Sequence, residues 1–226
     1  MKFKDSVIID EPLNGLSTFV IPTQVQDVVT ISGSMLGGML FSDNNKIPSL
    51  TSSMLDKGTR NNSKHEISNQ LESIGAEISF VSSNRHINFT AHCLKSNIDI
   101  VVRLIAEQLK EPTFPEDELL TLKKRMIANL EVSKDDTKKQ ALINFLREIY
   151  PKGHYNRRST IEDSINNIRS VQANDLIHFY EQAYGLGTLK IAAAGDISNA
   201  LFSALIKTHF DGWGEQAVQQ LDGCTS

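Results

Sequence analysis

The chain has 226 residues, of which 40% are hydrophobic and 22% are charged, and its formal net charge at pH 7 is -4. This is the composition of an ordinary globular protein, and the length suits one large domain or two small ones. The negative charge argues against a dedicated nucleic-acid-binding protein, because no basic stretch could release many counterions from a phosphate backbone.

The chain is predicted to begin with strands at residues 16–21 and 26–33, followed by helices at 48–57 and from the capping residues 62–63 to 74. Two strands at 76–82 and 86–92 come next, and then five helices at 98–109, 115–134, 137–150, 160–168 and 171–184. The last predicted elements are a strand at 189–194 and a helix at 199–209. The strands are rich in β-branched residues or alternate in polarity, and the helices repeat apolar residues every three or four positions. Residues 35–45, with Gly-Gly and Asp-Asn-Asn, indicate a loop.

This order predicts an α+β fold, in which helices cover a largely antiparallel sheet. Periodicity is lost after Trp213, so we expect one domain over residues 1–213 and a linker or tail over residues 214–226. The two cysteines, Cys93 and Cys224, could pair, but free thiols are expected because Cys224 lies in the polar tail.

The apolar run near the N-terminus is too short for a secretory signal, and no segment approaches the roughly 18 apolar residues of a membrane helix. We therefore expect a cytoplasmic protein that does not bind a membrane. A chain from which a signal peptide had been removed would have the same sequence features.

Three serines stand out in the helix predicted over residues 48–57. Ser49, Ser52 and Ser53 recur at three- and four-residue spacing, so their hydroxyls share one helical face. Read from the residues alone, they are small side chains that allow the helix to pack closely against the sheet.

Five segments in this order resemble the M16 metallopeptidase family, which includes insulinase, pitrilysin and the mitochondrial processing peptidases. They read MLDKGT, HEISNQLESIGAEISF, FPEDELLTLKKRMIANLEVSKDD, YPKGHYNRRSTIEDSINNI and AAAGDIS. The resemblance covers about residues 10–213 and implies an M16 (LuxS/MPP-like) metallohydrolase-type domain, the first of the two homologous domains that these proteins carry.

Active members of that family carry the zinc motif H-x-x-E-H on the helix before the M-L-x-x-G-T turn. Histidines four residues apart can hold one Zn²⁺, and the glutamate between them deprotonates the attacking water. Alignment on MLDKGT places Ser49 and Ser53 at the two histidines and Ser52 at the glutamate. The resemblance therefore implies that both ligands and the general base are missing.

The third zinc ligand of the family is a glutamate on a later helix, and counting back from Asp135-Asp136 places it at Asn129. A two-residue slip would place Glu131 there instead, but two residues turn about 200° around a helix. With Asn129 in that place, the resemblance implies neither catalytic residues nor bound zinc.

In the same family an unfolded peptide adds to an edge strand of the first domain, which is β-augmentation. The matching strand is residues 76–82, and the docking residues would be Ile78, Ser79, Phe80 and Val81. The alternative is that these residues only build the sheet.

Degenerate copies in this family commonly pair with a second M16-type domain or subunit, including an active homologue. The resemblance thus implies a non-catalytic scaffolding subunit or half-subunit that binds unfolded peptide, or a fragment of a two-domain protein. The alternative is an active zinc metalloendopeptidase whose metal site is rebuilt from other residues.

Overall fold

The computed structural model describes residues 6–154 and 156–215. One sheet runs through the molecule with the strand order β1-β2-β6-β3-β5-β4. Its strands are β1 (Ile8–Leu13), β2 (Leu16–Pro22), β3 (Val28–Leu36), β4 (Glu77–Ser82), β5 (His86–Leu94) and β6 (Lys190–Gly195). The β2–β6 pair is parallel and the other four pairs are antiparallel, which confirms the predicted α+β fold with a largely antiparallel sheet.

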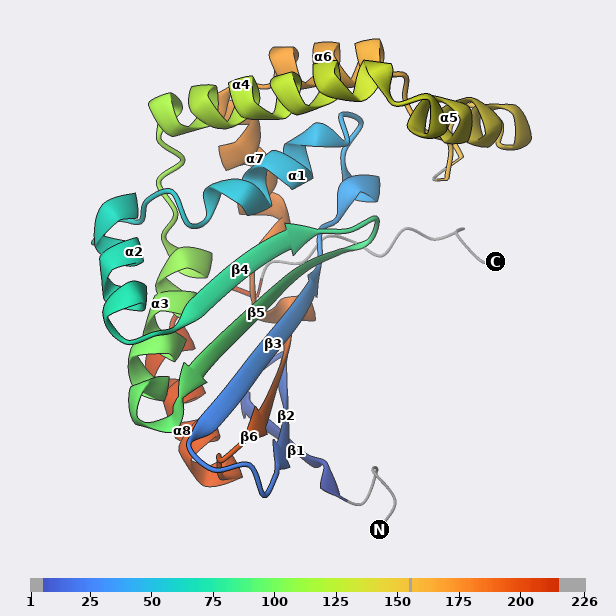
Figure 1. Cartoon of the computed structure of the whole chain (residues 1–226). Coiled ribbons are helices and arrows are strands. Elements are labelled where there is room, and N and C mark those ends of the chain that lie inside the picture. The colour runs from blue at the N-terminus through green and yellow to red at the C-terminus, as the bar shows by residue number, and fades with distance from the viewer. Residues whose placement is uncertain (1–5, 155, 216–226) are drawn as a thin grey trace.

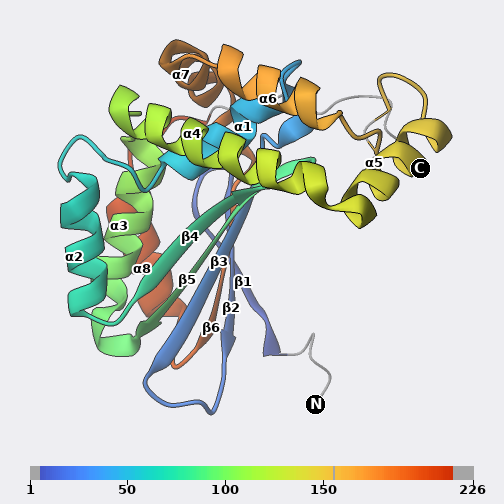
Figure 2. The same cartoon turned by 45° about the horizontal axis from the view of Figure 1, so that its top comes forward.

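The helices form two groups around this sheet. They are α1 (Lys46–Met54), α2 (Lys64–Ser73), α3 (Ile98–Lys110), α4 (Glu116–Val132), α5 (Thr137–Ile149), α6 (Ile161–Ser170), α7 (Ala173–Ala183) and α8 (Asn199–Phe210). Figure 1 shows α3 and α8 behind the sheet, whereas α1, α4, α6 and α7 gather beyond one end of the strands. The view in Figure 2 shows the same two groups.

The two faces of the sheet differ in burial. In β3, Val29, Ile31 and Met35 are buried on the face that meets α3 and α8, whereas Ser32 is exposed on the other face. In the part of the chain that the structure describes, no helix covers this second face (Figures 1 and 2). Alternation along the strands therefore separates a packed face from an open one.

Close packing on the buried face requires a glycine in β3. A Cβ on Gly33 would lie 2.1 Å from the ring of Phe89, its cross-strand partner. The ring of Phe89 fills the space that a side chain at position 33 would occupy, and it also meets Phe80 of β4 at a centroid distance of 6.0 Å.

A second, smaller core fixes α1. Leu50 and Met54 of α1 are fully buried against Leu119 and Leu122 of α4 and Leu176 of α7. The apolar side of α1 is thus held by helices, and α1 also contacts the edge strand β4.

Helix α5 has no buried residue. Leu142 and Phe145 are 56% and 59% exposed, and the helix projects from the end of α4 in Figure 1. Its apolar side chains pack against little of the described chain.

The predicted elements are confirmed in type and order, but the prediction missed one strand, β1. Ile8 and Ile9 are largely exposed, and Pro12 lies within the strand, as is typical of a sheet edge. With so little burial, β1 carries no clear alternation in the sequence. The predicted loop over residues 35–45 was also partly wrong, because β3 extends to Leu36 and a 3-10 helix, η2, spans Met39–Phe41.

Cys93 is a free, buried thiol, as expected, and Cys224 lies outside the described residues.

The domain boundary at residue 213 stays a prediction, since most of the tail lies outside the described residues. Gly214 does contact the domain, because its carbonyl accepts a hydrogen bond from the backbone amide of Leu186 at 2.9 Å. Among the helices of the described residues, none is long and apolar enough to cross a membrane.

Candidate functional site

Helix α1 carries the three serines and begins two residues earlier than predicted, at Lys46. The side chain of Asn44 accepts a hydrogen bond from the backbone amide of Lys46 at 3.0 Å, whereas the N-cap residue, Asn45, makes no capping hydrogen bond with its side chain. Pro48 then falls in the first turn, where a missing N–H breaks no hydrogen bond within the helix.

The serines are not a set of free hydroxyls. Ser52 is 2% exposed, and its hydroxyl donates to the backbone carbonyl of Ser49 at 3.0 Å. Ser49 and Ser53 are half-buried. The hydroxyl at the predicted general-base position therefore donates its proton to a carbonyl of its own helix.

The third predicted position lies on the neighbouring helix. Asn129 is exposed near the end of α4, and its backbone carbonyl accepts a hydrogen bond from the hydroxyl of Ser133 at 2.8 Å. Glu131, the alternative, pairs with Lys134 at 2.7 Å. Over the described ranges, no hydrogen bond or ion pair joins the side chain of Asn129 or Glu131 to the serines of α1.

The residues at these positions do not fit zinc. Serine hydroxyls and an asparagine amide offer a metal only neutral oxygen atoms, whereas zinc in proteins takes thiolate, imidazole and carboxylate ligands. Within residues 6–154 and 156–215, no group of three or more His, Cys, Asp or Glu residues is placed to hold a metal ion. We therefore derive no step through zinc for this chain.

Strand β4 ends the sheet, and among the described residues it pairs with β5 alone. The four predicted docking residues divide between its two faces. Ile78 and Phe80 are half-buried against the main core, whereas Ser79 is exposed and Val81 is 61% exposed on the open face. Any direct side-chain contact with a strand-like ligand on the open face would thus involve Ser79 and Val81.

The outer edge of β4 retains its hydrogen-bonding groups. The amide of Ser83 donates to the carbonyl of His86 at 2.7 Å, which sets the alternation of the antiparallel ladder. The main-chain groups of Ser79 and Val81 then point toward β5, and those of Ile78 and Phe80 point away from it. Ile78 and Phe80, whose side chains face the core, thus offer the backbone N–H and C=O groups at the free edge of the sheet.

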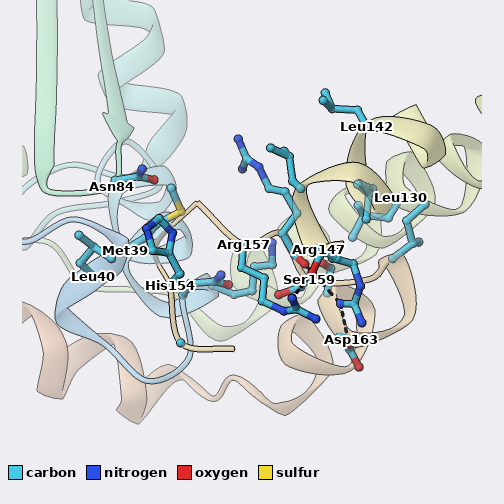
Figure 3. Close-up of a pocket in the computed structure, with 18 of the residues that line it drawn as sticks. Met39, Leu40, Asn84, Leu130, Leu142, Arg147, His154, Arg157, Ser159 and Asp163 are labelled. Carbon is cyan, nitrogen blue, oxygen red and sulfur yellow. Dashed lines mark hydrogen bonds and ion pairs between the residues drawn. The ribbon is translucent and has the colours of Figure 1, made fainter. Parts of the chain in front are cut away.

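A pocket of about 740 Å³ lies at the N-terminal end of α1. Its walls come from η2, the start of α1, helix α5 and the segment between α5 and α6. Figure 3 shows His154 beside Met39 and Leu40 at one end of the pocket, Leu130 and Leu142 at the other end, and Arg157 and Arg147 between them. We call it the α1–α5 pocket.

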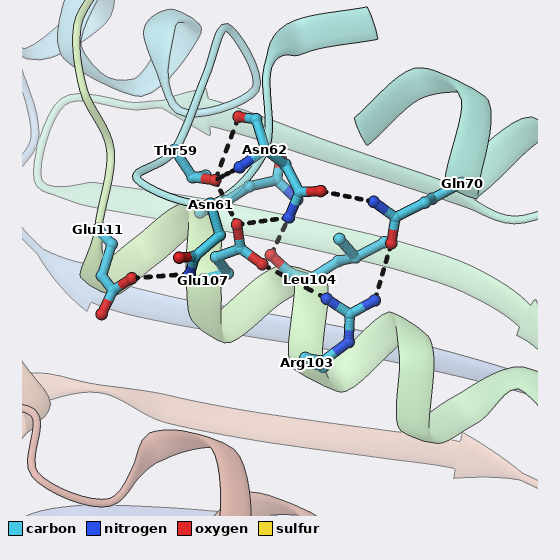
Figure 4. A network of polar contacts seen from close by, with 9 residues as sticks. Thr59, Asn61, Asn62, Gln70, Arg103, Leu104, Glu107 and Glu111 are labelled. Atoms are coloured by element: carbon cyan, nitrogen blue, oxygen red, sulfur yellow. Dashed lines mark hydrogen bonds and ion pairs between the residues drawn. The ribbon is translucent and has the colours of Figure 1, made fainter. Parts of the chain in front are cut away.

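A partly buried polar network fixes the turn that follows α1 (Figure 4). The side chain of Glu107 on α3 is 8% exposed. It accepts hydrogen bonds from the hydroxyl of Thr59 and, at 2.7 Å, from the side-chain amide of Asn62. Gln70 of α2 donates to Asn62 at 2.8 Å, and Arg103 donates to Gln70 at 2.8 Å. The network ties the M-L-x-x-G-T turn to α2 and α3.

The sequence interpretation did not identify the basic residues of the α1–α5 pocket. Lys46 lies more than one hundred residues before Arg157 and Arg158 in the sequence, and only the fold brings it to them. The adjacent Arg157-Arg158 pair was the one signal in the sequence that could have pointed to them.

Comparison with known proteins agrees with this fold. Residues 42–164, more than half of the chain, match the sequence profile of the family described as insulinase (peptidase family M16). Subunit 1 of the mitochondrial cytochrome b-c1 complex of Bos taurus is 24% identical over 173 residues, which cover 74% of this chain and 35% of that protein. An uncharacterized zinc protease of Mycobacterium leprae is 21% identical over 158 residues, which cover 70% of this chain and 35% of that protein.

A similar solved structure is the inactive domain of a peptidase M16 protein from Pseudomonas fluorescens. It superposes with a TM-score of 0.85 at 20% identity, over 95% of this chain and 52% of that one. The chain spans about a third of the length of these curated relatives and about half of that structure. The profile match and the shared fold together show that this chain belongs to the M16 (insulinase) family of peptidases.

Proposed function

We propose that this chain is a non-catalytic M16 protein, which binds unfolded peptide and serves as a scaffold in a peptidase, as a subunit or as half of one. The observation that supports the proposal most directly is the burial and hydrogen bonding of Ser52. Its buried hydroxyl donates to its own helix backbone at the position where an active relative needs a base. A serine hydroxyl stays protonated near pH 7 and cannot take a proton from water as a carboxylate does.

The geometry of β4 supports the peptide-binding part. An exposed edge strand offers unpaired N–H and C=O groups to an extended chain, and main-chain hydrogen bonds give affinity without a fixed sequence. Here that edge lies beside α1, and its outward groups belong to Ile78 and Phe80. The strand therefore keeps what peptide docking requires, although the zinc ligands are absent from α1.

The scaffolding part draws on the comparisons. The bovine relative is a subunit of a larger complex, and the Pseudomonas structure contains about as much chain again beyond the matched part. We infer that the partner is a second M16-type domain or subunit, including an active homologue. The exposed apolar side chains of α5 agree with a domain that has a partner.

Binding of an unfolded peptide to the purified chain tests the docking mode. We expect a labelled unfolded peptide to bind without being cleaved. The same peptide methylated on alternate backbone nitrogens should bind at least about tenfold more weakly, because it cannot complete a β-ladder. Equal binding of the two peptides would contradict docking on β4, and cleavage would contradict the non-catalytic assignment.

A further inference from the structure

We infer that the α1–α5 pocket binds the acidic side chains of a peptide that also carries apolar residues. The inference rests on the proposed function, since it names the chemistry of the peptide that the chain would hold. It is carried by the charge, the hydrogen bonding and the apolar wall of the pocket.

The pocket has an excess of positive charge in a protein whose net charge is -4. Two carboxylates, Asp43 and Asp163, line it together with five cationic side chains, namely Lys46, Lys139, Arg147, Arg157 and Arg158. One ion pair links the two sets, between Arg147 and Asp163 at 4.0 Å. The cations of the pocket are therefore left largely without opposite charge.

Lys46 is the cation with the least compensation. The side chain is half-buried, and its ammonium makes no hydrogen bond or ion pair with the residues that the structure describes. Burial lowers the pKa of Lys46, and the like charge of Arg158 lowers it further. A carboxylate placed beside these two groups would offset both effects.

Arg157 is held in place by neutral groups. Its guanidinium donates to the backbone carbonyls of Arg147 and, at 2.5 Å, of Tyr150, and neither acceptor carries a formal charge. Figure 3 shows Arg157 beside Arg147 and Asp163. A guanidinium fixed in this way is ready to bind a carboxylate without first being ordered.

The start of α1 adds to the positive potential. Helix α1 has nine residues, and its first turn contains no acidic side chain. The partial positive charge of a helix N-terminus therefore remains beside Lys46. This contribution is secondary to the side chains, because it weakens beyond the first turn.

The remaining wall is apolar and sets the second requirement for the ligand. Leu130 of α4 and Leu142, Ile143 and Leu146 of α5 line it. A volume of about 740 Å³ lies within the usual range of ligand pockets, about 300–1,000 Å³. A peptide segment with acidic side chains next to an apolar one matches both walls, whereas a phosphate backbone would leave the leucines uncovered.

The test compares short unfolded peptides that differ only in charge. A labelled peptide with several glutamates among leucines is titrated into the full chain by fluorescence anisotropy, beside its glutamine counterpart and a single-stranded oligonucleotide. We expect the glutamate peptide to bind about tenfold or more tightly than the glutamine peptide, with a difference that shrinks as salt is added.

The double variant Lys46→Gln, Arg158→Gln should remove this preference, and the matched variant Lys207→Gln, on the exposed surface of α8, should keep it. Equal binding of the two peptides, or a preference that survives the double variant, would overturn the inference and leave the proposed function intact. Binding of the oligonucleotide in preference to the glutamate peptide would overturn it in favour of nucleic acid. Failure of every peptide to bind would overturn the proposed function as well.

Discussion

Ser52 has two properties that matter at the scale of single residues. It is almost fully buried, and its hydrogen bond to Ser49 stays within α1. The hydrogen bond is local to α1, whereas the burial does not follow from the spacing of the serines, because it depends on the elements that pack against α1. Resemblance could place Ser52 at the general-base position, but only the fold shows that the surroundings have closed over it.

Ser52 should tolerate alanine but not glutamate. The serine hydroxyl bonds only within its own helix, so Ser52→Ala should change the free energy of unfolding by about 0.5 kcal/mol or less. Ser52→Glu would bury a carboxylate without a partner and should cost about 2 kcal/mol or more. Urea unfolding of the two variants measures both changes in the free energy of unfolding. A glutamate variant as stable as the wild type would show that position 52 is accessible to solvent and would contradict its burial.

Cys93 is predicted to be chemically inert in the folded chain. It is 5% exposed, and burial raises the pKa of its thiol to about 11, so the reactive thiolate is scarce near neutral pH. In the variant Cys224→Ser, a thiol reagent should label Cys93 only after denaturation. Complete labelling of the native protein within minutes would contradict the buried position of β5 in the sheet.

At the scale of elements, the network around Glu107 fixes the turn that follows α1. Glu107 accepts hydrogen bonds from Thr59, Asn62 and Arg103, so one carboxylate joins the turn after α1 to α3. The sequence showed this turn as a motif, but Glu107, which accepts a hydrogen bond from Thr59 of the motif, lies 48 residues later in the chain. Local patterns do not reveal such partners.

Glu107→Gln should destabilise the protein. The amide cannot accept from all three donors as the carboxylate does, and an unmet buried donor costs about 1–3 kcal/mol. Glu72→Gln on the exposed side of α2 serves as the control and should be neutral. Equal stability of the two variants in thermal unfolding would mean that the network does not hold the turn.

Helix α5 illustrates a different limit of sequence analysis. Its apolar spacing predicted an ordinary amphipathic helix, and the helix is present, but it has no buried residue. The spacing predicts the helix and its apolar face, but it does not show whether another element of the chain covers that face.

Polar substitutions on α5 should therefore cost little. Phe145→Ser should change the free energy of unfolding by about 0.5 kcal/mol or less, because the side chain is 59% exposed. Leu104→Ala on α3, where the side chain is fully buried, should cost about 2–5 kcal/mol. A loss from Phe145→Ser as large as that from Leu104→Ala would show that α5 packs on the domain in solution.

At the scale of the whole molecule, two hydrophobic cores stabilise different parts of the fold. The main core holds the sheet against α3 and α8, and the smaller one holds α1 between α4 and α7. Strong periodicity made most of these elements predictable from sequence. The missed strand β1 is half solvent-exposed, and the α1–α5 pocket is assembled from residues far apart in the chain. Neither leaves a local pattern.

Helix α1 contacts the edge strand β4, and the α1–α5 pocket lies at its N-terminal end. The central claim is that this α1 holds no zinc. Metal analysis of the purified chain by mass spectrometry, with a peptidase assay before and after chelation, tests it directly. The account predicts far less than one zinc per chain and no cleavage under either condition. One zinc bound per chain and lost together with peptidase activity on chelation would contradict it.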